Sequence, residues 1–139
     1  MRSQRAFTTT ELSIVVAALA LLAAAAVPRF FAVNRELRAG AVEALAVNVR
    51  SSAHLTNRIW SSNGRPGRLT VDGRVLDMRF GYPTEHSIGE VVVMGGDFEF
   101  ADGYWKHGDS SSAPGCAVLY IPPPNPESEP VVITYTDGC

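Results

Sequence analysis

The feature that most restricts the fold of this chain is an apolar run over residues 12–27, in which Ser13 is the only polar side chain and which follows a single carboxylate, Glu11. From Phe7 to Val27 there are about 21 residues, and a helix of that length extends roughly 31 Å, which matches the hydrocarbon thickness of a bilayer. The segment can therefore span a membrane. A carboxylate in hydrocarbon costs about 2.5 to 3.5 kcal/mol on insertion scales, so Glu11 requires a partner or a role.

The remainder of the chain has the composition of one small domain. The 139 residues carry a formal charge of -2. The aromatic residues are not interleaved with Lys/Arg clusters, so the composition argues against nucleic acid as a partner. The part that follows the first quarter, about 75 to 105 residues, would bury only a modest core and would benefit from a covalent crosslink.

Two cysteines can supply that crosslink. Cys116 and Cys139 lack CxxC spacing, and pairing them would close a loop of about two dozen residues and stabilise the fold by roughly 3 kcal/mol in the chain-entropy model. Such a bond persists only in an oxidising compartment, which would place the C-terminal side of the apolar run outside the cytoplasm. The alternative is two unrelated thiols.

Three interpretations of the apolar run compete at this point. A secretory signal peptide would have Arg2 and Arg5 as its basic region and a cleavage site within residues 23–26. A single-pass anchor would stay in the bilayer, and neither interpretation gives Glu11 a role. In the third, the membrane only stores the helix, which later packs against copies of itself so that Glu11 meets a cation of a neighbouring subunit.

The third interpretation agrees with a family resemblance. From Ala6 the sequence reads AFTTTELSIVVAALALLAAAAVPRFF, and it resembles the N-terminus of type IV pilins and pseudopilins. The resemblance implies that a prepilin peptidase cuts between Ala6 and Phe7 and methylates the new amine of Phe7. Glu11 then becomes the fifth residue of the mature chain and Pro28 the twenty-second, as in the family. Ala6 replaces the usual Gly and Thr9-Thr10 the usual Leu-Ile, and we expect cleavage because Ala is also small.

Cleavage would give Glu11 its partner. In a helical array stepped along an axis, the Glu11 carboxylate of one subunit can meet the Phe7 ammonium of the next within a dry core. Breaking one member of such a pair costs about 3 to 5 kcal/mol, so the pair would set the register between subunits. Pro28 removes a helical hydrogen bond, and it predicts a kink or local melting over residues 24–27, unless it marks an ordinary boundary between two helices.

A second helical pattern follows Pro28 and extends to about Ser61. Its apolar residues recur at spacings of three, four or their sums, while charged residues occupy the opposite face. Serines 61 and 62 with Asn63-Gly64 predict the end of the helix. The expected buried stripe contains Phe30, Val33, Leu37, Ala41, Leu45, Val49 and Ile59, and the expected solvent face carries Arg35, Glu36, Glu43, Arg50 and Arg58.

The chain then changes to strand-like patterns. Asp72-Gly73 between two short runs predicts a hairpin, and Leu76, Met78 and Phe80 alternate with polar residues until Gly81 ends the strand. A helix followed by antiparallel strands predicts an α+β fold with the sheet on the apolar stripe. The other expected strands are 90–94, 98–101, 117–121 and 131–136, with a turn at Asp102-Gly103 and loops at 95–96, 110–115 and 122–126.

The second half of the chain indicates which subgroup of the family the sequence resembles. Residues 80–83 read FGYP, and they are followed by the strand CAVLYI, a proline-rich loop and the C-terminal VVITYTDGC. These segments look like the mannose-sensitive haemagglutinin (MSHA) subgroup of type IV pilins. The resemblance implies a type IV pilin fold and a subunit of a Gram-negative surface pilus used in attachment. It also implies that Cys116 and Cys139 bound the loop that faces outward.

No constellation of residues indicates an enzyme, and no cofactor or metal is expected. His54, His86 and His107 have no metal-like spacing, and no phosphate loop or dinucleotide fingerprint is present in the sequence. A group of acidic residues in a loop-rich stretch has the hard oxygen ligands that Ca²⁺ prefers, but we expect solvated loop carboxylates there. These residues are Asp97, Glu99, Asp102 and Asp109.

The sequence therefore predicts a structural subunit that assembles into a filament. The expected organisation is a leader at 1–6, a transmembrane and filament-core helix at 7–31, an amphipathic half at 32–62 and a β-rich head at 63–139. The expected partners are copies of the chain, the prepilin peptidase, the pilus assembly machinery and the inner membrane, with the head in the periplasm before assembly and on the cell surface afterwards. A type II secretion pseudopilin and a secreted or membrane-anchored binding domain remain the alternatives.

Overall fold

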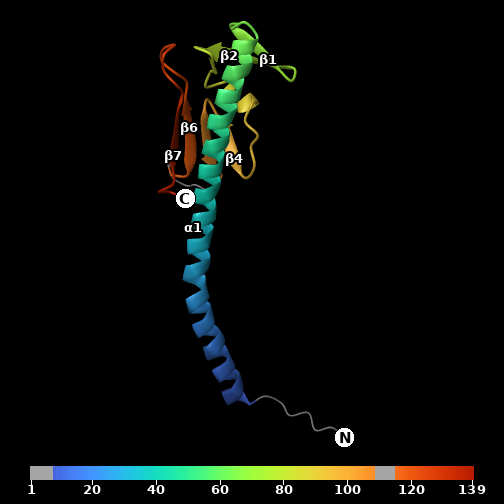
Figure 1. The fold of residues 1–139 in the computed structure, drawn as a ribbon. Helices are drawn as coiled ribbons and strands as arrows, with labels where there is room; N and C mark the ends of the chain where they lie inside the picture. Colours follow the sequence, from blue (N-terminus) through green and yellow to red (C-terminus); the bar gives the residue numbers. More distant parts are fainter. Residues whose placement is uncertain (1–7, 109–114) are drawn as a thin grey trace. The chain divides into compact units, whose positions relative to one another are not determined.

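The computed structural model describes residues 8–108 and 115–139. The chain forms two compact units, Met1–Glu36 and Leu37–Cys139. One α-helix, α1 (Thr9–Ser62), contains most of the described N-terminal unit and continues into the C-terminal unit (Figure 1). All strands belong to the C-terminal unit.

The N-terminal unit is helical because its residues favour that conformation. Ala and Leu, which both favour the helix strongly, dominate the apolar run. The helix is continuous through residues 24–27 and through Pro28, so there is neither local melting nor a boundary between two helices at this point. The kink at Pro28 stays a prediction.

In the C-terminal unit, one face of α1 is buried, and it differs from the expected stripe. Leu45 and Val49 are buried as predicted, but Leu37 is 66% exposed and Ala41 and Ile59 are only half-buried. Phe30 and Val33, in the N-terminal unit, are also exposed. The spacing did identify a helix, but burial depends on which turns the strands cover. The buried residues are Val42, Leu45, Ala46, Val49, Ala53 and Thr56.

The first sheet consists of β1 (Arg68–Val71), β2 (Arg74–Arg79) and β3 (Tyr82–Pro83), all antiparallel. The expected hairpin at Asp72-Gly73 is confirmed, with φ of 48° and 79° at the two turn residues. Positive φ at both positions is the type I′ pattern that suits the right-handed twist of strands. Leu76 is fully buried in β2, as its alternation predicted.

Strand β2 ends at Arg79, just before the predicted break at Gly81, but the chain does not leave the sheet there. Phe80-Gly81 form a second two-residue turn, with φ of 51° and 88°, and the chain returns as the short strand β3. Phe at a left-handed position gives no turn signal, because that conformation is costly for a bulky side chain. The tertiary structure holds the turn nevertheless.

The predicted strand over residues 90–94 is also wrong. Residues Ile88–Glu90 form a short 3₁₀ helix, η1, and no strand follows before Phe98. Val92 is buried whereas Val93 is 79% exposed. A short apolar run becomes a strand only where a neighbouring strand can satisfy its backbone groups, and this run has none.

The second sheet is a four-stranded antiparallel meander in the order β4-β5-β6-β7. Strands β4 (Phe98–Ala101) and β6 (Ala117–Ile121) match the prediction, and β7 (Val131–Tyr135) ends one residue earlier than predicted. Strand β5 (Tyr104–His107) was missed, although the turn before it at Asp102-Gly103 was recognised. The head therefore has two sheets rather than the single expected one.

The core of the C-terminal unit lies between α1 and the second sheet. Trp105, Val118 and Tyr120 are each at most 1% exposed. They belong to one hydrophobic cluster with buried apolar residues of α1. Figure 1 shows β4, β6 and β7 beside this part of α1. The Tyr120 hydroxyl donates to the carbonyl of Pro83 at 2.8 Å, which joins the two sheets. Burial raises the pKa of Tyr120 well above its usual range, so the hydroxyl keeps its proton.

The strained turn at Phe80 yields a stability prediction. We expect Phe80→Asn to stabilise the folded head by about 0.5 to 1 kcal/mol, because Asn tolerates the left-handed region that costs a bulky residue about 1 to 2 kcal/mol. Thermal unfolding followed by circular dichroism measures the effect. Asp72→Asn, at the corresponding position of the first hairpin, is the matched control and should be nearly neutral. A lower midpoint for Phe80→Asn would show that the ring contributes more by packing than the turn costs.

Candidate functional site

The apolar segment of α1 is the first candidate site. Every residue from 8 to 33 is exposed, including Leu21 at 74% and Leu22 at 67%. Soluble monomers rarely expose apolar patches larger than a few hundred Å². An exposed apolar surface of this extent is typical of segments that contact lipid or other protein chains.

By length and composition, α1 is able to cross a membrane. The segment lies near the N-terminus, where a signal sequence would have the same length and composition. The structure thus agrees with the expected transmembrane helix at this coarse level. Its orientation in a membrane and its cleavage remain predictions.

Glu11 takes part in a capping box at the start of α1. The backbone N–H of Thr8 donates to Glu11 Oε2 at 2.8 Å, and the Thr8 hydroxyl donates to the same oxygen at 2.9 Å. In return, the Glu11 N–H donates to Thr8 Oγ1 at 3.3 Å. This reciprocal pattern satisfies backbone donors that a helix start otherwise leaves unpaired, and a carboxylate there also complements the helix dipole.

The capping box is a role for Glu11 that the sequence reasoning missed. Its signal was present, because a Thr followed three residues later by Glu, just before an apolar run, is a known signature of a helix start. Both hydrogen bonds that the Glu11 carboxylate accepts from Thr8 go to the same oxygen, Oε2. The predicted partner of Glu11, the amine of Phe7 on another copy, lies outside the described residues together with Ala6. The cleavage site and the charge pair therefore stay predictions.

The disulfide is the second feature that the sequence predicted, and the structure confirms it. Cys116 and Cys139 are bonded across a sequence separation of 23 residues, with their Cα atoms 4.7 Å apart. Both residues are buried, and Cys116 is only 1% exposed. The N–H of Gly138 also donates to the carbonyl of Gly115 at 2.7 Å. The C-terminal end of the chain is therefore tied to the start of β6.

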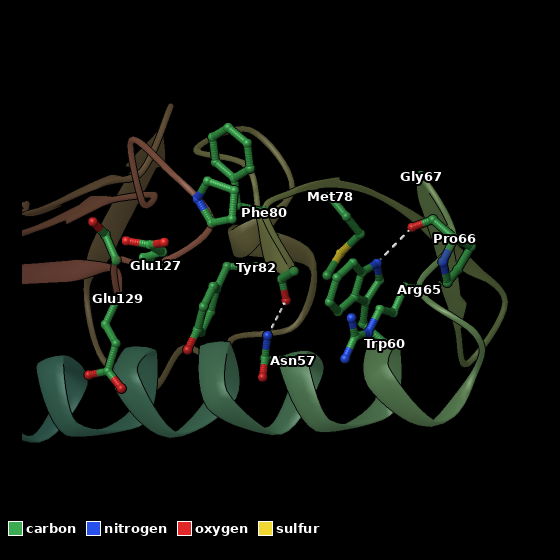
Figure 2. A pocket seen from close by; sticks show the side chains of 13 residues that line it. Asn57, Trp60, Arg65, Pro66, Gly67, Met78, Phe80, Tyr82, Glu127 and Glu129 are labelled. Atoms are coloured by element: carbon green, nitrogen blue, oxygen red, sulfur yellow. Dashed lines mark hydrogen bonds between the residues drawn. The ribbon is translucent and has the colours of Figure 1, made fainter.

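A cavity of about 680 Å³ lies in the C-terminal unit at the end of α1. Figure 2 shows that its walls come from α1, the turn that follows, the β2–β3 hairpin and the proline-rich loop before β7. The Asn57 side chain donates to the carbonyl of Gly81 at 2.8 Å, and the Trp60 indole donates to the carbonyl of Pro66 at 2.7 Å. These two bonds attach the hairpin and the turn to the helix.

The cavity has charges of opposite sign at its two ends. The Arg65 guanidinium lies 5.8 Å above the centre of the Trp60 ring at one end. The carboxylates of Glu127 and Glu129 lie at the other end, near Tyr82 (Figure 2). Burial raises the pKa of Tyr82, and the charge of Glu129 raises it further. The sequence reasoning did not find this cavity.

The histidines and acidic residues singled out in the sequence occupy separate positions. His54 contacts the ring of Tyr82 edge-on, and His86 Nδ1 lies 2.7 Å from an Asp102 oxygen. Asp97 and Glu99 are exposed, and Asp109 lies outside the described residues. Within residues 8–108 and 115–139, no group of three or more His, Cys, Asp or Glu side chains is placed to hold a metal ion.

Comparison of the chain with protein-family models, curated proteins and solved structures gives no match. The features that bear on function are therefore the exposed apolar helix with its capped carboxylate and the disulfide-bonded head.

Proposed function

We propose that this protein is a structural subunit that assembles, through its N-terminal helix, into a filament of the type IV pilin kind. The single observation that carries the proposal is the helix surface over residues 8–33, which is exposed along its whole length and carries Glu11 near its start. Lipid covers such a surface before assembly, and the helices of neighbouring subunits cover it afterwards. A folded, disulfide-bonded head would then be displayed outside the helical core.

The assembly step uses the N-terminal end of the helix. Cleavage by the prepilin peptidase between Ala6 and Phe7 creates an ammonium group, and this group pairs with Glu11 of an adjacent subunit. Because Glu11 already accepts from Thr8 through Oε2, the carboxylate is held at a defined position, and its other oxygen can take the second partner. The alanines at 23–26 permit close approach of neighbouring helices, as small residues do in membranes.

The head supports a location outside the cytoplasm. The Cys116–Cys139 bond requires an oxidising compartment, which is the periplasm before assembly and the cell surface afterwards. Attachment is the role that the MSHA-type resemblance implies for such a head. A type II secretion pseudopilin would have the same helix, and the disulfide at the C-terminal end favours the pilin.

A second candidate is a membrane-anchored binding domain that does not assemble. The observation that favours it is the cavity of about 680 Å³ in the head, a volume within the range of ligand pockets. In that case the helix would serve only for export and anchoring.

The mature N-terminus distinguishes these candidates. We expect intact-mass and N-terminal sequencing of protein from its native membrane to show a chain that begins at methylated Phe7, because only the cleaved amine can neutralise Glu11 in a filament core. Protein produced without the peptidase is the control and should retain residues 1–6. A mature chain beginning near Val27 would instead show removal of a signal peptide, and an uncleaved Met1 would show a permanent anchor.

A further inference from the structure

The cavity at the end of α1 combines aromatic rings with unpaired negative charge. Glu127 and Glu129 are exposed, and neither carboxylate forms an ion pair with any cation in the part of the chain that the structure describes. Tyr82 lies near them (Figure 2), and Phe80, which is 42% exposed, lines the same cavity. The volume of about 680 Å³ suits a small organic molecule.

The opposite end of the cavity shows how this environment accepts a cation. Arg65 places its guanidinium 5.8 Å from the centre of the Trp60 ring, which is within the range of cation–π attraction. Arg79 lies 6.0 Å above the Phe80 ring, but it is not among the residues that line the cavity. At the acidic end, Glu127 and Glu129 line the same cavity as Tyr82, and no described cation pairs with either carboxylate. This end therefore has the complementary chemistry for an added cation.

The backbone at Phe80 gives a second reason to consider this end of the cavity. The other two-residue hairpins have Asp at the corresponding position, Asp72 and Asp102, with φ of 48° and 49°. Phe80 adopts a φ of 51° at greater steric cost, although its ring is not buried in the core. Strained residues of this kind concentrate at functional sites, where the side chain is needed in one position.

We propose that the acidic end of this cavity binds a small molecule that carries an alkylammonium group, with Glu127 and Glu129 as its charge partners and Phe80 and Tyr82 as its aromatic wall. The carboxylates supply the attraction, and the rings stabilise the positive charge and the alkyl chain. The site lies entirely in the C-terminal unit, so it does not depend on filament assembly.

The test is a titration of the full-length protein, in nonionic detergent micelles at constant ionic strength, with 1,5-diaminopentane. Intrinsic tryptophan fluorescence is the readout, since Trp60 lines the cavity whereas the other tryptophan, Trp105, is fully buried. We expect a saturable change with the diamine and none with the neutral analogue 1,5-pentanediol. The double variant Glu127→Gln/Glu129→Gln should weaken the affinity by about tenfold or more, because charged hydrogen bonds are lost.

Two further variants separate binding from folding. Glu43→Gln removes an exposed carboxylate of α1 that does not line the cavity, and it should bind the diamine as the wild type does. Phe80→Asn should bind more weakly although its thermal midpoint is unchanged or higher. The proposal is overturned if the wild type gives no saturable response in the millimolar range, if the diol binds equally well, or if the double Gln variant binds as tightly as the wild type.

Discussion

Glu11→Gln is expected to abolish filaments while the protein is still made, exported and held in the membrane. Glutamine at this position still serves a capping box, so the helix start remains intact and only the charge is lost. The Phe7 ammonium of the neighbouring subunit would then be buried without a partner, at a cost of about 3 to 5 kcal/mol for each contact. This corresponds to a loss of roughly 10² to 10³-fold or more in subunit association.

The capping box makes a matched control possible. Thr8→Ala removes the hydroxyl that donates to Glu11 but keeps the carboxylate, and we expect filaments to form because loss of a cap costs only about 1 kcal/mol. Glu11→Ala removes both the cap and the charge, and it should fail in the same way as Glu11→Gln. Electron microscopy of sheared surface material, with immunoblotting of membranes, measures assembly and export separately.

These variants give contrasting outcomes for the two roles of Glu11. If the carboxylate serves assembly, filaments require the negative charge of Glu11 and do not require an intact capping box. Wild-type filament levels from Glu11→Gln would contradict the charge pair and leave the capping box as the role of this residue.

Cys116→Ala/Cys139→Ala is expected to destabilise the head by about 3 kcal/mol. The bond closes a loop with a sequence separation of 23 residues, and opening that loop returns chain entropy to the unfolded state. Domains of this size have a total stability of only about 5 to 15 kcal/mol, so the loss is a large fraction. In urea unfolding of the full chain in micelles, the midpoint should fall by about 1 to 3 M, because typical slopes are about 1 to 3 kcal/mol per molar.

Reduction of the wild-type protein provides the control for the disulfide prediction. Adding a thiol reductant should lower the midpoint of the wild type toward that of the double variant and should leave the double variant unchanged. Since Cys116 is buried against the core, part of the loss in the variant comes from the missing sulfur atoms, and the reduced wild type measures the crosslink alone. If the reduced wild type and the double variant both unfold at the midpoint of the oxidised wild type, the bond does not stabilise the head.

Much of the fold could be predicted from local patterns. The helix end near Ser62, the turns at Asp72-Gly73 and Asp102-Gly103, and most of the second sheet follow from residue types acting on their own neighbours. The misses have a common physical cause. Strand β5 and the loop after Glu90 depend on which segment lies beside them, and a single sequence window carries no information about that neighbour.

The candidate sites divide in the same way. The disulfide and the Thr8–Glu11 capping box are contained in the sequence, although the second was not used. The cavity could not be predicted, because Trp60, Phe80 and Glu129 come from three separate segments. Only packing of the hairpin and the proline-rich loop on α1 brings them together.

Local residue patterns are sufficient to specify the apolar helix, the acid at its start and the covalent closure of the C-terminal end. Helix propensity, hydrophobicity and a capping pair act over a few residues, and therefore they can be read directly along the chain. Tertiary packing, in contrast, buries Val42 and Ala46 and leaves Leu37 exposed, and it holds Phe80 in a strained turn at a cavity that two glutamates also line. These features depend on contacts between distant segments, where packing across the whole head outweighs local preference.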